Sequence, residues 1–175
     1  MKKIIFPIFA AVLLLIGCKK ANELTKFDIS YETTVVIPSA TNINLPFDIS
    51  TPDIETNHQS KFEINKTSKD RIESIELSKL KLTVKTPDGN DFSFLKSIEI
   101  YIDGDNLSEE KIAWKDPVPN SAGTSITLDV SGTDLKPYIL NENFNLRVRS
   151  VTDEVITADH EIEIKSTFTV DAKIL

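Results

Sequence analysis

Apolar residues recur at every second position along most of this chain, and the longest such run lies near the C-terminus. From Ile162 onward, Ile164, Phe168, Val170 and Ile174 keep one parity, with small residues at positions 166 and 172. Successive side chains of a β-strand point to opposite faces, so this period predicts a strand with one buried and one solvated face. The run is expected to form the last, long strand of the fold.

Seven further segments show the same alternation. They are residues 27–37, 43–49, 75–84, 98–102, 110–115, 125–130 and 144–148. Turn-forming residues separate several of them, as in TPDGND and DGDN. Strands at this spacing, with no strand–helix alternation, predict an all-β fold: an antiparallel β-sandwich, Ig-like or related, of about eight strands with one or two short helical turns.

Two irregularities interrupt the alternation. Leu77 and Leu80 have opposite parity, which predicts a bulge or bend near Ser78 and Lys79. Pro46 lies on the polar side of its run. Proline cannot donate a hydrogen bond to a neighbouring strand, so this position predicts an edge strand or a bulge.

Three shorter segments carry weaker signals. The segment SGTDLKPYIL predicts a helical turn capped by Thr133, with its apolar residues on one face. Phe62 and Ile64 alternate and predict a short strand. The following SKDRIESIE predicts a helical turn that begins at Ser68.

The first residues have the anatomy of a secretory signal peptide. Lys2 and Lys3 are followed by an uncharged, mostly apolar run from Ile4 to Gly17. This run of 14 residues is short for a membrane span, which needs about 20 predominantly apolar residues. Pro7 also lies inside it, where it would remove a helical hydrogen bond. A cleaved export signal is therefore favoured over a permanent span.

The end of this run resembles the bacterial lipobox, with Leu15, Ile16 and Gly17 directly before Cys18, the only cysteine. The resemblance implies cleavage between Gly17 and Cys18, a diacylglycerol on the Cys18 sulfur and often an acyl chain, such as palmitate, on the new amine. It divides the chain into a signal peptide (1–17), a lipidated tether (18–26) and a β-sandwich domain (27–175). A plain secreted protein is the alternative, but it leaves a lone cysteine without a role.

The segments FSFLKSIEIYIDGDNLSEEKIAWKD and TSITLDVSGTDLKPYIL, followed by NFNLRV, resemble uncharacterised β-sandwich lipoproteins of Bacteroidota. The resemblance covers about Phe62 to Ile174; it implies the fold and a cell-envelope location, and no activity. Surface-exposed lipoproteins of that group are often acid-rich after the cysteine, whereas KKANE follows Cys18 here. We therefore expect a lipid-anchored protein of the outer membrane that faces the periplasm.

Charge and cysteine content narrow the classes of partner. The formal net charge is −7, which argues against nucleic acid because phosphate backbones repel an acidic protein. One cysteine allows no disulfide within the chain, so packing must supply the stability. We predict no cofactor and no metal site. Oxygen ligands for Ca²⁺ could come from Asp103, Asp105, Asn106, Glu109 and Glu110, but a hairpin turn at Asp103-Gly104 explains the same residues.

Catalytic signals are weak. His58 and His160 are far apart in sequence, and we expect the first in a polar loop and the second at the solvated end of a strand. Neither a nucleophile motif nor a zinc motif is present. Tyr101 and Trp114 could form an aromatic platform for a glycan. Tyr101 has the parity of a solvated face, whereas Trp114 is expected in the core.

These observations favour a non-catalytic, lipid-anchored module that binds or scaffolds an envelope protein or a glycan. One alternative is a closed barrel that carries a small apolar ligand, as lipocalin-type folds do. Another is a glycan-processing enzyme that uses two of the many carboxylates. In the favoured hypothesis, the lipid on Cys18 anchors the protein to the membrane.

Overall fold

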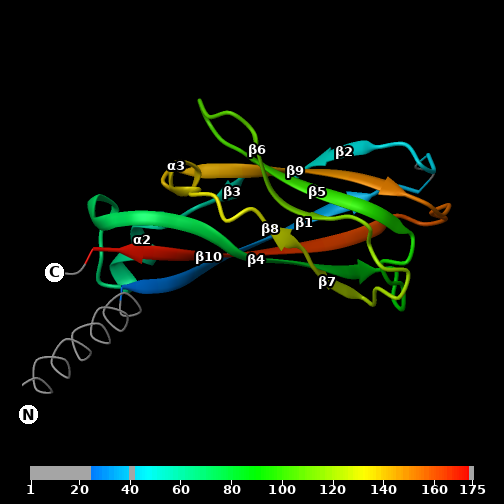
Figure 1. Ribbon diagram of the computed structural model, residues 1–175, viewed down its shortest axis with the longest axis horizontal. Helices are drawn as coiled ribbons and strands as arrows, with labels where there is room; N and C mark the ends of the chain where they lie inside the picture. The colour runs from blue at the N-terminus through cyan, green and yellow to red at the C-terminus, as the bar shows by residue number, and fades with distance from the viewer. Residues whose placement is uncertain (1–24, 40–41, 174–175) are drawn as a thin grey trace, which may run out of the picture.

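Ten strands form two antiparallel sheets that pack face to face (Figure 1). The computed structural model describes residues 25–39 and 42–173. One sheet has the order β1-β10-β4-β7, and the other has the order β2-β9-β5-β6-β8 with β3 beside β9. The strands are β1 (Lys26–Ile37), β2 (Phe47–Ser50), β3 (Ile54–Glu55), β4 (Ile72–Thr86), β5 (Leu95–Asp103), β6 (Glu110–Lys115), β7 (Ser125–Thr127), β8 (Asp129–Val130), β9 (Asn143–Thr152) and β10 (His160–Ala172).

Strands from the start of the chain pair with strands from its end, and successive pairs lie inside one another along the sequence, as in a long hairpin that is rolled up. β1 pairs with β10, β2 with β9, β4 with β7 and β5 with β6. This nesting of eight strands into two four-stranded sheets is the jelly-roll topology, and β3 and β8 are two-residue additions at its margins. The predicted antiparallel sandwich is confirmed, and its strand order is that of a jelly roll rather than an immunoglobulin domain.

The parity of the apolar residues places the core between the sheets. On β10, the residues from Ile162 to Ala172 that share the apolar parity are all buried. They meet the inner face of the other sheet, where Phe144 and Phe168 pack edge to face with ring centroids 6.2 Å apart. The result is an open sandwich with a side-chain-filled interior, not the closed barrel that the apolar-carrier alternative requires.

The predicted bulge in β4 is confirmed. Phe168 pairs with Leu77 and Thr167 pairs with Lys79, so Ser78 is left without a partner position in the ladder. The extra residue shifts the parity of the strand, and both Leu77 and Leu80 are therefore buried. The edge position predicted from Pro46 is also confirmed, because β2 begins at the next residue and is an end strand of its sheet.

The short strand predicted around Phe62 is wrong, because these residues form helix α2 (His58–Ile64). A helix places residues four apart on one side, and both His58 and Phe62 are buried, the latter against Phe27. Ile64 is left 79% exposed at the end of α2. The helical turn predicted after Ser68 is the 3₁₀ helix η1 (Lys69–Arg71), although the Ser68 side chain makes no capping hydrogen bond.

The second predicted helical turn is α3 (Lys136–Ile139), which begins after Leu135 and not at Thr133. Asp134 takes the capping role. Its Oδ1 accepts hydrogen bonds from the backbone N–H of Lys136 at 3.0 Å and from that of Ile75 on β4 at 2.9 Å. One carboxylate therefore caps the helix and ties it to the edge of the first sheet.

Asp134→Ala is expected to lower the free energy of unfolding by about 0.5–1.5 kcal/mol, because the part-buried N–H of Ile75 loses its acceptor. Asp134→Asn is the matched control, since its side-chain oxygen can accept both hydrogen bonds. Urea unfolding monitored by circular dichroism measures the difference. Equal midpoints for the alanine and asparagine variants would show that the side-chain oxygen does not tie α3 to β4.

Candidate functional site

Both histidines are buried, contrary to the sequence-based expectation. His58 is 3% exposed, and its Nδ1 lies 3.0 Å from the hydroxyl of Thr56. His160 is 5% exposed and lies between the Asn90 side chain and the carbonyl of Ala158, at 2.9 and 2.8 Å. They sit at opposite ends of the sandwich, His58 on α2 and His160 where β10 begins (Figure 1). The fold does not bring them together into one site.

Trp114 lies on the outer face of the second sheet, so its predicted place in the core is wrong. Ile112 and Ala113 are consecutive and both buried. This bulge in β6 accompanies a register shift after Ile100 and reverses the parity of the strand. Trp114 is therefore paired with Glu99 on the solvated face, where it is half-buried. The outward position of Tyr101 is confirmed.

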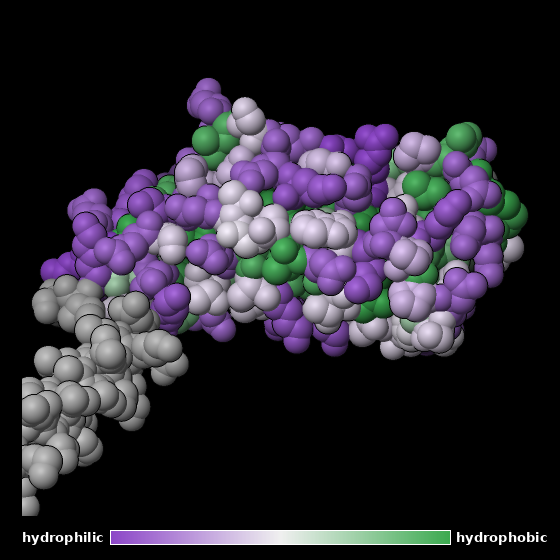
Figure 2. Space-filling model, viewed as in Figure 1, coloured by the Kyte–Doolittle hydropathy of each residue, from purple (hydrophilic) through white to green (hydrophobic). Residues whose placement is uncertain are grey.

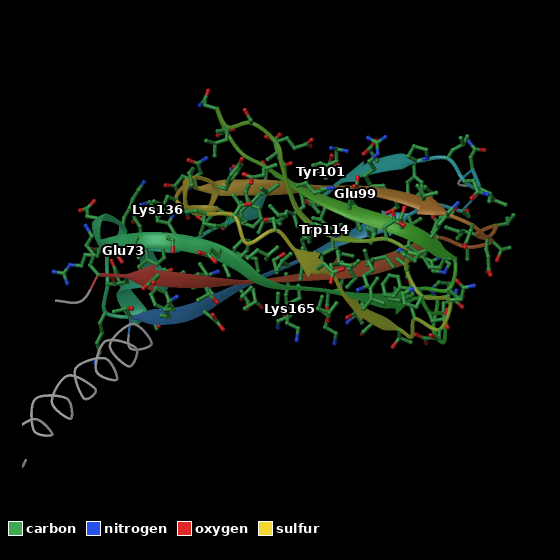
Figure 3. The ribbon with its side chains drawn as sticks, viewed as in Figure 1. Glu73, Glu99, Tyr101, Trp114, Lys136 and Lys165 are labelled. Atoms are coloured by element: carbon green, nitrogen blue, oxygen red, sulfur yellow. The ribbon has the colours of Figure 1, made fainter. Side chains whose placement is uncertain are left out.

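Charged and aromatic side chains form two rows across this outer face. The first row runs in register through five strands: Asp48, Arg149, Glu99, Trp114 and Asp129. The second row consists of Ser50, Arg147, Tyr101 and Lys111. Figure 3 shows Glu99, Tyr101 and Trp114 gathered on the neighbouring strands β5 and β6. We call these two rows, together with Glu109, the polar aromatic face.

Arg147 organises one half of the polar aromatic face. Its Nε and Nη2 each donate to a carboxylate oxygen of Glu109 at 2.6 Å, and its Nη1 donates to Asp48. Its guanidinium also lies over the ring of Tyr101, 4.1 Å from the centroid. The fork of a guanidinium matches a carboxylate in two-point contact, which holds the side chain in one orientation.

Glu99 organises the other half. It accepts a hydrogen bond from the Tyr101 hydroxyl at 2.9 Å and another from Lys111 Nζ at 3.1 Å. Lys111 Nζ also lies 5.5 Å from the centre of the Trp114 ring. One face of each aromatic ring is thus already next to a cation.

These contacts lower the pKa of two carboxyl groups of the face, those of Glu99 and Glu109. The hydrogen bond from Tyr101 lowers the pKa of Glu99, and the bidentate contact with Arg147 lowers the pKa of Glu109. Burial, and then the neighbouring Glu99, raises the pKa of Tyr101. A general acid needs a raised carboxyl pKa, so the electrostatics of Glu99 and Glu109 suit binding rather than proton donation.

Two of the acidic residues considered for Ca²⁺, Asp103 and Glu109, are engaged in other contacts. The Asp103 carboxylate accepts the backbone N–H of Gly104 at 2.9 Å, in the link between β5 and β6, and Glu109 is bound to Arg147. Among residues 25–39 and 42–173, no group of three or more His, Cys, Asp and Glu has the arrangement of a metal site. A turn between the two strands is confirmed, but it is not centred on Asp103-Gly104, because Asp103 ends β5 and the backbone N–H of Leu107 donates to the carbonyl of Gly104 at 3.0 Å.

Sequence reasoning missed Arg147 and Arg149. Their signal is the segment NLRVRSV, in which two arginines alternate with apolar residues and share the solvated parity. What the alternation does not reveal is that Arg147 meets Asp48 and Glu109, which are 99 and 38 positions away. Cys18 and Gly17, the predicted lipidation and cleavage residues, lie outside the described residues.

Large apolar side chains are exposed at the end of the sandwich opposite the start of β1. They are Ile43 and Leu45 before β2, and Val155 between β9 and β10. Figure 2 shows this gathering of apolar residues at the end farthest from the grey N-terminal residues, with hydrophilic side chains over much of the remaining visible surface. No helix within the described part of the chain is long and apolar enough to cross a membrane.

Comparison with known proteins identifies no family. No family model and no curated protein match the chain. Among solved structures, FlhE matches with a TM-score of 0.32 and 7% identity, over 83% of this chain and 98% of that one. CpGH89CBM32-5 from Clostridium perfringens, solved in complex with GalNAc-β-1,3-galactose, matches with a TM-score of 0.34 and 10% identity, over 76% and 94%. Desmodium yellow mottle tymovirus matches with a TM-score of 0.28 and 10% identity, over 86% and 84%. TM-scores this low carry no functional argument.

Proposed function

We propose that the chain is a lipid-anchored protein of the cell envelope whose jelly-roll domain is a non-catalytic binding module. Its binding surface is the polar aromatic face, and its partner is another envelope protein. The lipid is attached to Cys18, and the domain faces the periplasm from the outer membrane. The single observation that carries the binding role is the fixed cluster of Tyr101, Trp114 and Arg147 on one sheet face.

The composition of this cluster favours a protein partner. Trp, Tyr and Arg are the residue types enriched among those that dominate the binding energy of protein interfaces. Arg147 and Tyr101 are already held in place by Glu109 and Glu99. Fixed side chains lose less conformational entropy on binding, so the face is preorganised for a partner.

A glycan partner fits the same face less well. Sugars commonly pack on an uncovered aromatic ring, whereas Arg147 lies over Tyr101 and Lys111 lies near the Trp114 ring. Catalysis on a glycan would need one protonated carboxyl of a pair. The lowered pKa of both Glu99 and Glu109 argues against that role for them.

Site-specific photocrosslinking in intact cells tests the proposal. A photoreactive residue in place of Arg149, an exposed cation on the polar aromatic face, is expected to form an adduct with one envelope protein. The matched control replaces Lys165, an exposed cation on the outer face of the other sheet (Figure 3), where no such adduct is expected. Adding Arg147→Ala or Tyr101→Ala to the first protein is expected to weaken binding about thirtyfold, or about 2 kcal/mol.

The free energy of unfolding of each variant is measured as a control, to show that weaker binding is not caused by a loss of the fold. Arg147 is part of a partly exposed ion-pair network, so Arg147→Ala is expected to change the free energy of unfolding by no more than about 1 kcal/mol. The proposed surface would be contradicted if the photoreactive residue formed the same adduct at position 165 as at position 149. It would also be contradicted if the adduct from position 149 persisted in both the Arg147→Ala and the Tyr101→Ala proteins. Binding of a purified glycan that is lost in the Tyr101 variant would replace the protein partner with a sugar.

A further inference from the structure

The segment formed by α2 and η1 lies beside the point where the chain enters the first sheet. The backbone N–H of Lys173 donates to the carbonyl of Arg71 at 2.8 Å, and Phe27 packs against Phe62 with ring centroids 6.3 Å apart. Figure 1 shows α2 at the same end of the sandwich as the start of β1 and the end of β10. This end is therefore the part of the domain that is nearest to Cys18 along the chain.

The distance between this end and a lipid on Cys18 is limited. Six residues lie between Cys18 and Thr25, and the seven residue-to-residue steps that join them span at most about 25 Å when fully extended. The sandwich is longer in the direction of its strands, since β10 alone has 13 residues, or about 43 Å at the usual rise per residue. A lipid on Cys18 would thus hold the α2–η1 end close to the bilayer and leave the opposite end free to point away.

The α2–η1 end exposes an apolar side chain next to cations. Ile64 is 79% exposed, the highest value among the large apolar side chains of the described residues. Lys66 and Lys69 follow it, and both are exposed. Lys69 Nζ donates one hydrogen bond to the carbonyl of Leu140 at 3.3 Å, which leaves its other two N–H groups for a phosphate. Residues 58–71 contain four Lys and Arg against two Asp and Glu, in a chain whose net charge is −7. An apolar tip flanked by cations is suited to the boundary between lipid headgroups and acyl chains.

The loops at the opposite end have the reverse charge. Residues 87–94, 116–124 and 153–159 connect strands there (Figure 1), and they contain six Asp and Glu with no Lys or Arg. An anionic surface attracts nearby cations, at roughly 1 kcal/mol per Lys or Arg, and repels carboxylates. The contrast in charge between residues 58–71 and these loops therefore favours an orientation in which the α2–η1 segment is the part nearest to an anionic bilayer.

We propose that the α2–η1 end docks on the membrane, with Ile64 inserted at the headgroup level and Lys66 and Lys69 against anionic lipid phosphates. This docking rests on the lipid anchor of the proposed function, because one exposed isoleucine is too small to hold the domain by itself. It orients the sandwich with its strands rising from the bilayer. The polar aromatic face then points sideways, where a partner in the same membrane or beside it can reach it.

The lipidated mature chain with Ile64→Cys, purified from membranes and labelled with an environment-sensitive fluorophore, tests the docking. A thioether on Cys18 leaves position 64 as the only free thiol. The vesicles contain phosphatidylcholine with about 30% phosphatidylglycerol, an anionic lipid that gives the surface a negative potential. In these vesicles we expect the emission of the fluorophore at position 64 to shift to the blue and to be quenched by doxyl-labelled lipids. Leu45→Cys is the control, because Leu45 is an exposed apolar residue at the opposite end, 57% exposed. Its label is expected to stay in water.

Two readouts separate this proposal from the one on which it rests. Failure of the labelled protein to float with the vesicles would show that no lipid anchor is present, and it would contradict the proposed function. Flotation with no quenching at position 64, or with equal quenching at 64 and 45, would contradict docking alone. Flotation with quenching confined to position 64, and weaker quenching when phosphatidylglycerol is left out, is the expected result.

Discussion

Phe168→Ala is expected to lower the free energy of unfolding of the sandwich by about 3–5 kcal/mol. Phe168 is 0% exposed and lies on β10, which pairs with both β1 and β4. Its ring meets those of Tyr31 and Phe144 edge to face, with centroids 5.8 and 6.2 Å away. Removing it takes away apolar contacts and leaves a cavity that strands fixed on both sides cannot collapse to fill. Urea unfolding followed by fluorescence and circular dichroism measures the loss.

Thr167→Ala is the matched control for this prediction. Thr167 is the preceding residue of β10 on the outer face, where its hydroxyl lies 3.2 Å from that of Ser30. We expect it to cost less than about 1 kcal/mol, the range over which exposed strand positions differ. Phe168→Leu keeps part of the apolar volume and should fall between the two, which gives a readable value if the alanine variant does not fold. If Phe168→Leu and Phe168→Ala each lowered the free energy of unfolding by no more than Thr167→Ala, this aromatic cluster would not be the centre of the core.

The parts of the fold that were predicted correctly depend on local pattern alone. The parity of residues 162–172 identifies the buried face of β10, and the parity slip between Leu77 and Leu80 identifies the bulge at Ser78. Burial of one face is a strong constraint in a sheet, because a shift of one residue exposes the whole apolar set. The pattern therefore predicts both the fold class and the position where the ladder is interrupted.

The error at Trp114 has a different origin. Its parity within EKIAWK matches that of Ile112, so the sequence favours the core for both. The bulge that separates them is visible only in the pairing of β6 with β5, where Ala113 opposes Ile100 and Lys111 opposes Tyr101. A small residue such as Ala113 gives little hydrophobic signal of its own, so the inward turn at that position is not apparent in the sequence.

The polar aromatic face could be predicted only in part. The parity of Tyr101 correctly predicts its position on the solvated side. The contacts that fix the face, Arg147 with Asp48 and Glu109, join residues far apart in the chain and depend on the nested pairing of the jelly roll. The burial of His160 has the same origin, since its partner Asn90 lies 70 positions away. Such long-range contacts are set by topology, which alternation alone does not specify.

Cys18→Ala is expected to abolish the incorporation of an alkyne-labelled palmitate and to move the protein from the detergent phase to the aqueous phase in a cloud-point separation. The thiolate is the nucleophile that forms the thioether, and Cys18 is the only thiol in the chain. Two or three acyl chains give stable anchoring at roughly 0.8 kcal/mol per buried CH₂, so Cys18→Ala protein that has also lost residues 1–17 should be released completely. Acyl labelling in growing cells, followed by phase partition, measures both effects.

Lys19→Ala is the control for Cys18→Ala, because it changes the next residue and keeps the thiol. The Lys19→Ala protein should retain both the acyl label and the partition into the detergent phase.

An uncleaved signal peptide could also hold the Cys18→Ala protein in the membrane. The mass of the protein distinguishes that case, since the precursor keeps residues 1–17. Membrane retention without acyl label and with the precursor mass is therefore consistent with lipidation of Cys18. Acyl label that persists in Cys18→Ala, or its absence from the unsubstituted protein, would contradict the lipid anchor. The domain from β1 onward would then need another means of reaching the envelope, and the docking of Ile64 would lose the tether that makes one isoleucine and two lysines sufficient.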